Sequence, residues 1–295
     1  MQKHFEINYL PFHISITALE QAELPPFLGS TLRGVIGQAL LQTDRQASAF
    51  LYRNGEDPDL DTGKVVVKPY IIIPPEICTP YTIVEQGEKI DFEFLMLGNG
   101  AEYGSSLIAA LEQIYRFGLG ARRYAFRLSE IISSQEQRII WRNGRRLISV
   151  LNSAVVPWLE LQHVTGVVVK VCTPLRIRHG GRLVKKITFQ ALIRNITNRI
   201  LEITERYGGW TDRDEAVRIQ TLAAEVQTVR HELRLEHLDR YSNRTNRKMD
   251  LSGLVGELEY KGDLTPFVPW LYAAQWLHVG RNTTFGMGKI RVYFI

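Results

Sequence analysis

The chain has 295 residues, of which 45% are hydrophobic and 23% charged, so it can bury one large core or two ordinary ones. No apolar run approaches the roughly 20 residues that span a bilayer, and the amino-terminal stretch lacks the uninterrupted apolar segment of a secretory signal. Two cysteines, Cys78 and Cys172, are too few for a disulfide framework or a thiolate metal site. We therefore expect a cytoplasmic protein with no membrane contact, no metal and no cofactor.

The charge is divided unevenly along the chain. Residues 1–163 hold 15 Lys and Arg against 18 Asp and Glu, whereas residues 164–295 hold 21 against 13. A basic half suggests an anionic partner, most commonly RNA or DNA. A solvated basic face without any partner would give the same counts, so the motifs must decide.

The first half is expected to have the order β-α-β-β-α-β. It opens with a strand pair or one long bent strand over Phe5–Leu19, with Pro11 as the break. Runs rich in Val, Ile and Phe predict further strands, and apolar residues at helical spacing predict two helices. A polar loop is expected from Asp44 to Gly63. The remaining predicted elements are a helix over 27–41, strands over 64–73 and 88–97, a helix over 107–115 and a strand over 124–132.

The second half is expected to repeat this order. Its first helix, over 188–207, has one apolar face and closes at Gly208-Gly209. Thr265 is the expected N-cap of its last helix, with Pro266 at the first helical position. The remaining predicted elements are a strand or hairpin arm over 166–178, an inserted helix over 212–226, strands over 229–240 and 253–260, a helix over 266–278 and a strand over 289–294. Two such units predict an α+β protein with tandem ferredoxin-like domains, 1–163 and 164–295, each built on an antiparallel sheet.

A stretch without acidic residues runs from Lys170 to Leu201 and contains eight Lys and Arg residues. Its centre, RIRHGGRLVKK, is predicted to form a hairpin that turns at His179-Gly180-Gly181. A projecting basic hairpin can lie along a phosphate backbone or enter a groove. A solvated turn is the alternative. The residues predicted to bind nucleic acid here are Arg176, Arg178, Arg182, Lys185 and Lys186.

A second polar segment, RYSNRTNRK, lies between two predicted strands. Its arginines can contact phosphates, its tyrosine can stack on a base, and its Ser and Asn side chains can bond base edges. An ordinary polar hairpin is the alternative. The candidate residues are Arg240, Tyr241, Ser242, Arg244, Arg247 and Lys248.

A glycine-rich stretch, HVGRNTTFGMGK, joins the last predicted helix to the last strand. Glycines allow close backbone approach to a ligand and can expose successive N–H groups to phosphate, although a tight turn also requires them. The stretch is neither a Walker A loop nor a Rossmann fingerprint. Its candidates are Gly280, Arg281, Asn282, Thr283, Gly286, Gly288 and Lys289. GLGARR, with Arg122 and Arg123, occupies the equivalent place in the first half and suggests a shared binding role.

Metal and triad chemistry find little support among the seven histidines. His231 and His237 are six residues apart, which suits neither a helical pair nor a zinc pattern. There is no Gly-x-Ser-x-Gly elbow, and no Glu follows Asp57, Asp59 and Asp61 at the spacing of a calcium loop.

Several segments together resemble the CRISPR repeat-processing endoribonucleases, the sixth Cas family within the RAMP superfamily. They are HVGRNTTFGMGKI, DRYSNRTNRKMDLSGLVGELEY, CTPLRIRHGGRLVKKITFQALIRNI, FLGSTLRGVIGQAL and GLGARRYAFRLSEI. The resemblance implies tandem RAMP-type domains that bind a CRISPR repeat RNA. It also implies cleavage without metal, in which a ribose 2′-OH attacks the adjacent phosphate and leaves 2′,3′-cyclic phosphate and 5′-OH ends.

Such cleavage needs a base, an acid and cations around the phosphate. Histidine is the usual acid or base because it titrates near neutrality. Many family members carry a histidine in or near the first helix, some at the position of Gln38, but the helix over Gly29–Leu41 has none. His278, at the start of the glycine-rich stretch, is the first substitute. His4 and His13 are further candidates, and Arg33 could stabilise the phosphate.

Two other functions remain open. The chain could be a non-catalytic RAMP subunit that binds guide RNA in an effector complex, or a basic protein-interaction module. Beside the repeat RNA, the resemblance allows other CRISPR effector subunits, or a second copy of the chain in a homodimer, as partners.

Overall fold

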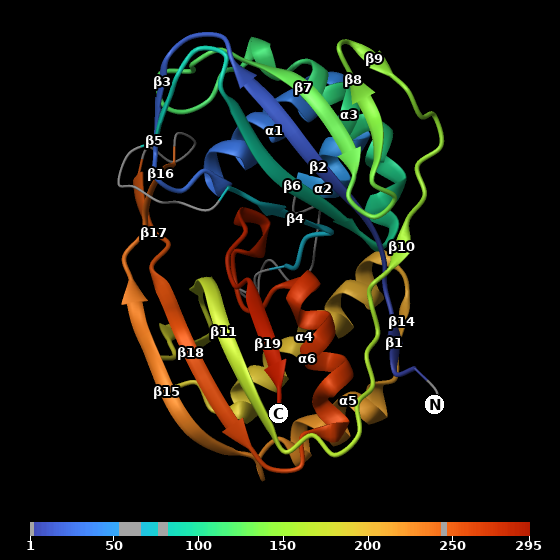
Figure 1. The fold of residues 1–295 in the computed structure, drawn as a ribbon, viewed down its shortest axis with the longest axis vertical. Coiled ribbons are helices and arrows are strands. Elements are labelled where there is room, and N and C mark those ends of the chain that lie inside the picture. Colours follow the sequence, from blue (N-terminus) through green and yellow to red (C-terminus); the bar gives the residue numbers. More distant parts are fainter. Residues whose placement is uncertain (1–2, 53–65, 76–81, 243–246) are drawn as a thin grey trace. The chain divides into compact units, whose positions relative to one another are not determined.

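A computed structural model describes residues 3–52, 66–75, 82–242 and 247–295. The chain divides into two units (Figure 1), one formed by Met1–Ile7 with Val156–Ile295 and the other by Asn8–Val155. The expected division lay between residues 163 and 164. The structure instead assigns the first seven residues to the same unit as the carboxyl-terminal half. Within the described ranges, no helix is long and apolar enough to cross a membrane.

The Asn8–Val155 unit is built on an antiparallel sheet whose central part has the spatial order β4-β6-β2-β7. In chain order these strands are the second, third, first and fourth, which is the ferredoxin-like arrangement that the element order predicted. Two short strands extend the sheet beyond β7, and β10 pairs with β2. The bounds are β2 (Asn8–Ala18), β4 (Tyr70–Ile73), β6 (Lys89–Leu97), β7 (Phe126–Ser133), β8 (Arg138–Arg142), β9 (Arg145–Arg146) and β10 (Ala154–Val155).

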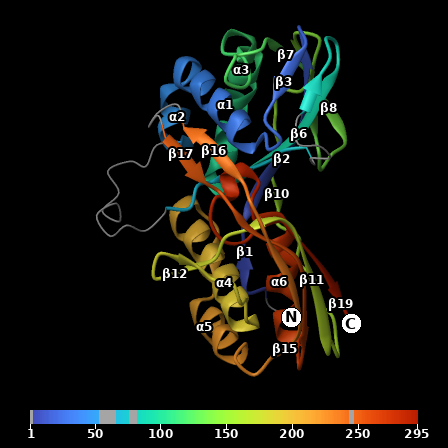
Figure 2. The ribbon, with the colours of Figure 1, turned by 90° about the vertical axis from the view of Figure 1, so that its left-hand side faces the viewer.

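Figure 2 shows the helices of this unit on one face of that sheet. The core is formed by the helices together with alternate residues of the strands, such as Phe12, Ile14 and Phe94. A separate two-stranded ribbon pairs β3 with β5. The bounds are β3 (Ala22–Leu24), α1 (Gly29–Thr43), α2 (Arg45–Tyr52), β5 (Thr82–Val84), η2 (Gly98–Tyr103), α3 (Gly104–Glu112) and η3 (Ile114–Arg116).

Two predictions for this unit were wrong. Pro11 does not break β2, because its missing N–H faces a gap in the ladder: β10 covers Asn8 and Tyr9, and β7 starts only at Phe12. The expected polar loop after residue 44 begins as helix α2. The Asp44 carboxylate accepts N–H bonds from Gln46 and Ala47, both at 3.0 Å, and so caps this helix. Residues 45–52 of the expected loop form α2, and its remaining residues, 53–63, lie outside the described part of the chain.

The Met1–Ile7 and Val156–Ile295 unit has a four-stranded antiparallel sheet of the same topology, β15-β18-β11-β19. The central strand β11 places Val169 opposite Leu258 on one side and Val292 on the other. Helices α4 and α6 pack against each other and cover the core, and α5 is the predicted insertion. The bounds are β11 (Gly166–Leu175), α4 (Phe189–Tyr207), α5 (Arg213–Leu222), β15 (Gln227–Glu236), β18 (Gly253–Lys261), α6 (Val268–Leu277) and β19 (Ile290–Phe294).

Smaller elements complete this unit. Thr188 caps α4 by accepting the N–H of Ala191, and the helix ends at Gly208 as predicted. Thr265 does not cap α6; it begins a 3-10 turn, and its hydroxyl accepts the N–H of Val164 at 3.1 Å. The bounds are β12 (Arg178–His179), β13 (Arg182–Leu183), β14 (Trp210–Thr211), β16 (Asp239–Ser242), β17 (Arg247–Asp250), η4 (Thr265–Phe267) and η5 (Thr283–Phe285).

The amino-terminal segment is an integral part of this second unit. Strand β1 (Phe5–Glu6) pairs with β14, and the fully buried Phe5 ring lies 5.0 Å from Trp158 and 4.9 Å from Trp270, between centroids. Residues distant in sequence therefore complete one core.

Candidate nucleic-acid interface

The basic hairpin, defined here as residues 178–186, forms as predicted. Strand β12 pairs with β13, and the two turn glycines have φ values of 54° and 77°. Arg178, Arg182, Lys185 and Lys186 are exposed. No acidic side chain of the described ranges pairs with any of them. The hairpin therefore presents net positive charge to solvent.

Arg176 differs from its neighbours because its side chain is buried, with 4% of its surface exposed. Its guanidinium donates to the carbonyl of Ser252 and lies 3.6 Å from the Asp250 carboxylate. Burial lowers the pKa of Arg176, and Asp250 opposes that shift. Arg176 thus fastens the base of the hairpin to the end of β17, a position that argues against the predicted contact with RNA.

The RYSNRTNRK segment forms an antiparallel ribbon of β16 and β17, in which Arg240 pairs with Met249 and Ser242 with Arg247 in the backbone register. Arg244 lies outside the described residues. For Arg240, Tyr241, Ser242, Arg247 and Lys248 the structure describes only the strands, so their role in binding remains a prediction. The ribbon begins beside Arg176, because Leu238 donates its N–H to the Ser252 hydroxyl at 3.2 Å.

The glycine-rich loop, defined here as residues 278–289, is a compact turn. Gly280, Asn282, Gly286 and Gly288 have φ values between 66° and 84°, where glycine and asparagine are favoured. A Cβ at Gly288 would lie 1.8 Å from the Val279 carbonyl oxygen. At Gly280 it would lie 2.7 Å from the carbonyl oxygen of Arg176. These glycines are thus required for the backbone to pack closely within the protein.

Hydrogen bonds fix this loop to the end of β11. Arg281 donates its N–H to Arg176 O at 2.9 Å, and Gly288 donates to Pro174 O at 3.2 Å. The Thr173 hydroxyl donates to Gly286 O at 2.8 Å and accepts from the N–H of Lys289 at 2.9 Å. These amides bond within the protein, so the predicted cradle of N–H groups for phosphate finds no support at Arg281, Gly288 and Lys289.

The side chains of Arg281, Asn282 and Lys289 are partly exposed, whereas Thr283, Gly286 and Gly288 are buried. Arg178 and Arg281 are both close enough to disfavour the charge on Arg176, and Arg178 also lowers the pKa of Asp250, after its hydrogen bonds with Ser252. Arg281 is bonded through its N–H to Arg176 O, and Arg178 lies two residues beyond Arg176. The hairpin and the glycine-rich loop, more than 90 residues apart in sequence, therefore contribute cations close to one another.

His278, the first catalytic candidate, is buried, with 1% of its surface exposed. Its Nδ1 lies 3.1 Å from the Met287 carbonyl, so the neutral ring donates that bond. Burial lowers the pKa of His278 to about 3, and the charges of Arg199 and Lys289 reinforce the effect. A neutral, inaccessible ring is poorly placed for acid–base catalysis, and this burial argues against the predicted role.

Arg33 lies on α1 and is held by aromatic side chains. Its Nε donates to the Tyr70 hydroxyl at 2.9 Å, and its guanidinium carbon lies 5.1 Å from the centre of the Tyr52 ring. Burial raises the pKa of both tyrosines. The tyrosine pair fixes Arg33 and leaves its predicted contact with phosphate untested.

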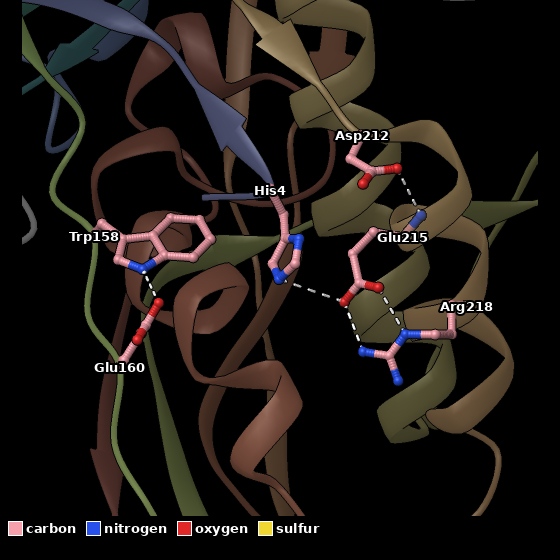
Figure 3. A network of polar contacts seen from close by, with 6 residues as sticks. All are labelled: His4, Trp158, Glu160, Asp212, Glu215 and Arg218. Atoms are coloured by element: carbon pink, nitrogen blue, oxygen red, sulfur yellow. Dashed lines mark hydrogen bonds and ion pairs between the residues drawn. The ribbon is translucent and has the colours of Figure 1, made fainter. Parts of the chain in front are cut away.

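His13 and His4 have different surroundings. His13, on β2, is 41% exposed in its side chain, and its Nε2 lies 3.9 Å from the Asp91 carboxylate. His4 lies against Trp158, with 5.7 Å between ring centroids, and its Nε2 is 3.8 Å from Glu215, which also binds Arg218 through two hydrogen bonds (Figure 3). Of the two, His13 has the more accessible ring.

The second Gly/Arg loop lies between η3 and β7, as predicted. Gly118 has φ 66°, and a Cβ there would lie 2.1 Å from the Arg123 carbonyl oxygen. Arg122 and Arg123 are exposed. This loop belongs to the Asn8–Val155 unit, and its role in RNA binding remains a prediction.

The sequence did not predict the polar residues that hold the base of the hairpin and the glycine-rich loop in place. These are Thr173, Asp250, Ser252 and Arg199. Arg199 had a detectable signal: it follows Leu192 and Ile196 at helical spacing on the apolar face of α4 and is 5% exposed. In the described part of the chain, no group of three or more His, Cys, Asp or Glu side chains could hold a metal ion.

Two family models match the chain in succession. Residues 7–153 match a model described as an N-terminal domain, and residues 169–290 match the model of the CRISPR-associated endoribonuclease Cas6. The second match includes the basic hairpin and the glycine-rich loop. No protein of established annotation matches the chain significantly.

Solved Cas6 structures share the fold over nearly the whole chain. Thermus thermophilus Cas6 is 12% identical with a TM-score of 0.57, and the alignment covers 97% of this chain and 99% of that one. A Cas6 product complex is 14% identical with a TM-score of 0.61, covering 96% and 99%. A partial Cas6-RT-Cas1–Cas2 complex reaches 0.66 at 11% identity, covering 98% of this chain but 46% of that one. Residues 169–290 therefore match the model of the CRISPR-associated endoribonuclease Cas6 family, and nearly the whole chain shares the fold of solved Cas6 structures.

Proposed function

We propose that this chain binds CRISPR repeat RNA through the basic hairpin and the glycine-rich loop and cleaves it without a metal ion. The observation that carries the proposal is the shared surface on which Arg178 and Arg281 lie, in the part of the chain that matches the Cas6 model. The Asp250 carboxylate, which lies near this group, is engaged by Arg176 at 3.6 Å. An excess of exposed cations favours contact with a phosphate backbone.

The proposed reaction is an internal transfer. The 2′-oxygen forms a bond to the adjacent phosphorus while the bond from phosphorus to the 5′-oxygen breaks. A base accepts the 2′-proton, an acid donates a proton to the leaving 5′-oxygen, and cations stabilise the charge on the phosphate. The products are a 2′,3′-cyclic phosphate and a 5′-OH, and no oxidant or water is consumed.

His13 is the strongest of the four catalytic candidates for acid–base work. Its ring is accessible, and its Nε2 lies 3.9 Å from the Asp91 carboxylate. His4 is held by Glu215 and Trp158, and His278 is buried. Arg33 is proposed to stabilise the phosphate, because a guanidinium is a cation suited to a negatively charged phosphate.

The alternative is a subunit that binds RNA without cutting it. Two observations favour it: α1 contains no histidine, and His278 is inaccessible. Both functions use the same cationic surface and differ only in the chemistry that follows binding. Association with other Cas proteins or with a second copy of the chain fits either function, and light scattering with and without RNA tests it.

The deciding experiment incubates the purified chain with labelled repeat RNA in excess EDTA. Site-specific cleavage that leaves a cyclic phosphate supports the nuclease. Tight, salt-sensitive binding without cleavage over hours supports the RNA-binding subunit, and the absence of salt-sensitive binding contradicts both. A His13→Asn variant that loses about 100-fold or more in single-turnover rate while retaining affinity would identify the acid or base.

A further inference from the structure

Two buried polar residues lie beneath the glycine-rich loop, one on α4 and one at the end of α6. Arg199 is 5% exposed, and its Nε donates to the carbonyl of Leu277, the last residue of α6, at 2.6 Å. The carbonyl end of a helix carries partial negative charge, which stabilises a cation placed there. Burial nevertheless lowers the pKa of Arg199 to about 10, so this position is costly for the protein.

His278 is the residue that follows Leu277, and it has φ 56°. Its Nδ1–H bond to Met287 O joins the first residue of the glycine-rich loop to a residue near its end. The adjacent backbone bond from Val279 N–H to Gly288 O, 2.9 Å long, closes the same base. Arg199 and His278 therefore hold two consecutive residues at the point where α6 turns into the loop.

The free atoms of the two side chains are complementary. Arg199 Nη2, a donor, and His278 Nε2, an acceptor in the neutral ring, are both buried, and neither has a hydrogen-bond partner among the residues that the structure describes. Arg199 is near enough for its charge to disfavour protonation of His278. One side chain of the pair thus offers a hydrogen-bond donor, and the other offers an acceptor.

We propose that Arg199 and His278 are positioning residues that hold the glycine-rich loop in the conformation that presents Arg281 and Lys289 to RNA. The inference rests on the proposed RNA binding, but it concerns the loop itself and can be tested without RNA. Arg199 acts through the end of α6, and His278 acts through Met287. Neither side chain needs to touch the nucleic acid.

A purely structural role in the core would have a different signature. An apolar side chain of similar length often replaces a buried charge with little loss of overall stability. Arg199→Met should therefore fold but leave Leu277 O without its donor. The effect should be concentrated in the glycine-rich loop, whereas a general packing defect would loosen α4 and the sheet equally. Arg194→Met, at an exposed position of the same helix, is the matched control.

The first measurement is hydrogen exchange at the amides of Val279, Arg281 and Gly288. In Arg199→Met these should exchange at least about tenfold faster than in the wild type while amides of β11 and β18 keep their rates. Arg199→Lys retains a cation and a donor and should restore part of the protection. Unchanged loop exchange, or equal acceleration throughout the unit, would overturn the proposal.

His278 provides an independent pair of variants should Arg199→Met fail to fold. Asparagine tolerates the positive φ and can donate to Met287 O, whereas leucine can do neither. His278→Asn should keep the loop amides protected within about threefold, and His278→Leu should lose at least about tenfold. Equal exchange in both variants would remove His278 from this role.

RNA binding supplies the second readout. Arg199→Met should weaken repeat-RNA binding about tenfold, with recovery in Arg199→Lys and no change in Arg194→Met. Wild-type protein that fails to bind RNA would contradict the proposed function, and the exchange data would still decide the loop's dependence on Arg199. Wild-type binding with an unaffected Arg199→Met variant would overturn the inference alone.

Discussion

Replacing Gly288 with alanine tests whether the glycine-rich loop is as closely packed as its backbone indicates. A Cβ at this position would lie 1.8 Å from Val279 O, and φ is 72°. The left-handed conformation costs a non-glycine residue about 1–2 kcal/mol. Relieving the contact also displaces the partners of the Val279 N–H bond to Gly288 O, at about 1–3 kcal/mol. We therefore expect Gly288→Ala to lower the free energy of unfolding by about 2–5 kcal/mol.

Gly180→Ala is the matched control, because φ is 54° there but no atom lies within 4 Å of the added Cβ. Its cost should be close to the conformational penalty alone, about 1 kcal/mol. Urea unfolding followed by tryptophan fluorescence measures both variants. If Gly288→Ala is no more destabilising than Gly180→Ala, the loop can rearrange freely, and the argument for a fixed turn is refuted.

Three further outcomes follow from the same structure. Charge reversal at Arg178 and Lys185 should weaken RNA binding irrespective of RNA sequence. It should also reduce the slope of log affinity against log salt concentration by at least about 1 per residue, with an unchanged melting temperature. A change in melting temperature without a change in RNA binding would show that the hairpin has only a structural role. Phe5→Ala should cost about 3–5 kcal/mol in urea unfolding, because the buried ring packs on two tryptophans; a cost below about 1 kcal/mol would mean that the segment is dispensable. Burial lowers the pKa of His278 from 6.5 to about 3, so below pH 6.5 the unfolded chain gains a proton that the folded chain does not. Unfolding free energy should therefore fall by about 2 kcal/mol from pH 7 to 5, and this loss should disappear in His278→Asn; equal pH profiles would contradict the buried neutral ring.

Much of the fold could be predicted because both sheets follow from local patterns. Helix α4 has its N-cap at Thr188, its stop at Gly208 and one apolar face, and it forms as expected. Two of the errors arise where long-range pairing decides. Pro11 tolerates a strand interior only because its neighbours leave a gap, and β1 joins a strand formed by residues 210–211. No local pattern in the sequence specifies either partner.

The sequence predicted the positive charge of the site but not which of its side chains point to solvent and which are buried. A run of Lys and Arg gives the number of cations, and the structure then turns Arg178 outward and Arg176 inward. Burial of Arg176 depends on Asp250 and Ser252, which lie more than 70 residues away. Arg199 is the exception, because its place in the helical repeat of α4 indicated a buried position.

The two Gly/Arg loops explain what glycine contributes to each unit. Gly118 and Gly288 have nearly equal φ values, 66° and 72°, and each brings its Cα against a carbonyl oxygen of its own loop, at Arg123 and Val279 respectively. These glycines therefore close turns within the protein, whether or not a ligand binds. The case for RNA rests instead on the arginines that the turns display, Arg281 in one loop and Arg122 and Arg123 in the other. A loop fixed by its glycines can hold such cations in place before RNA arrives, which reduces the entropy lost on binding.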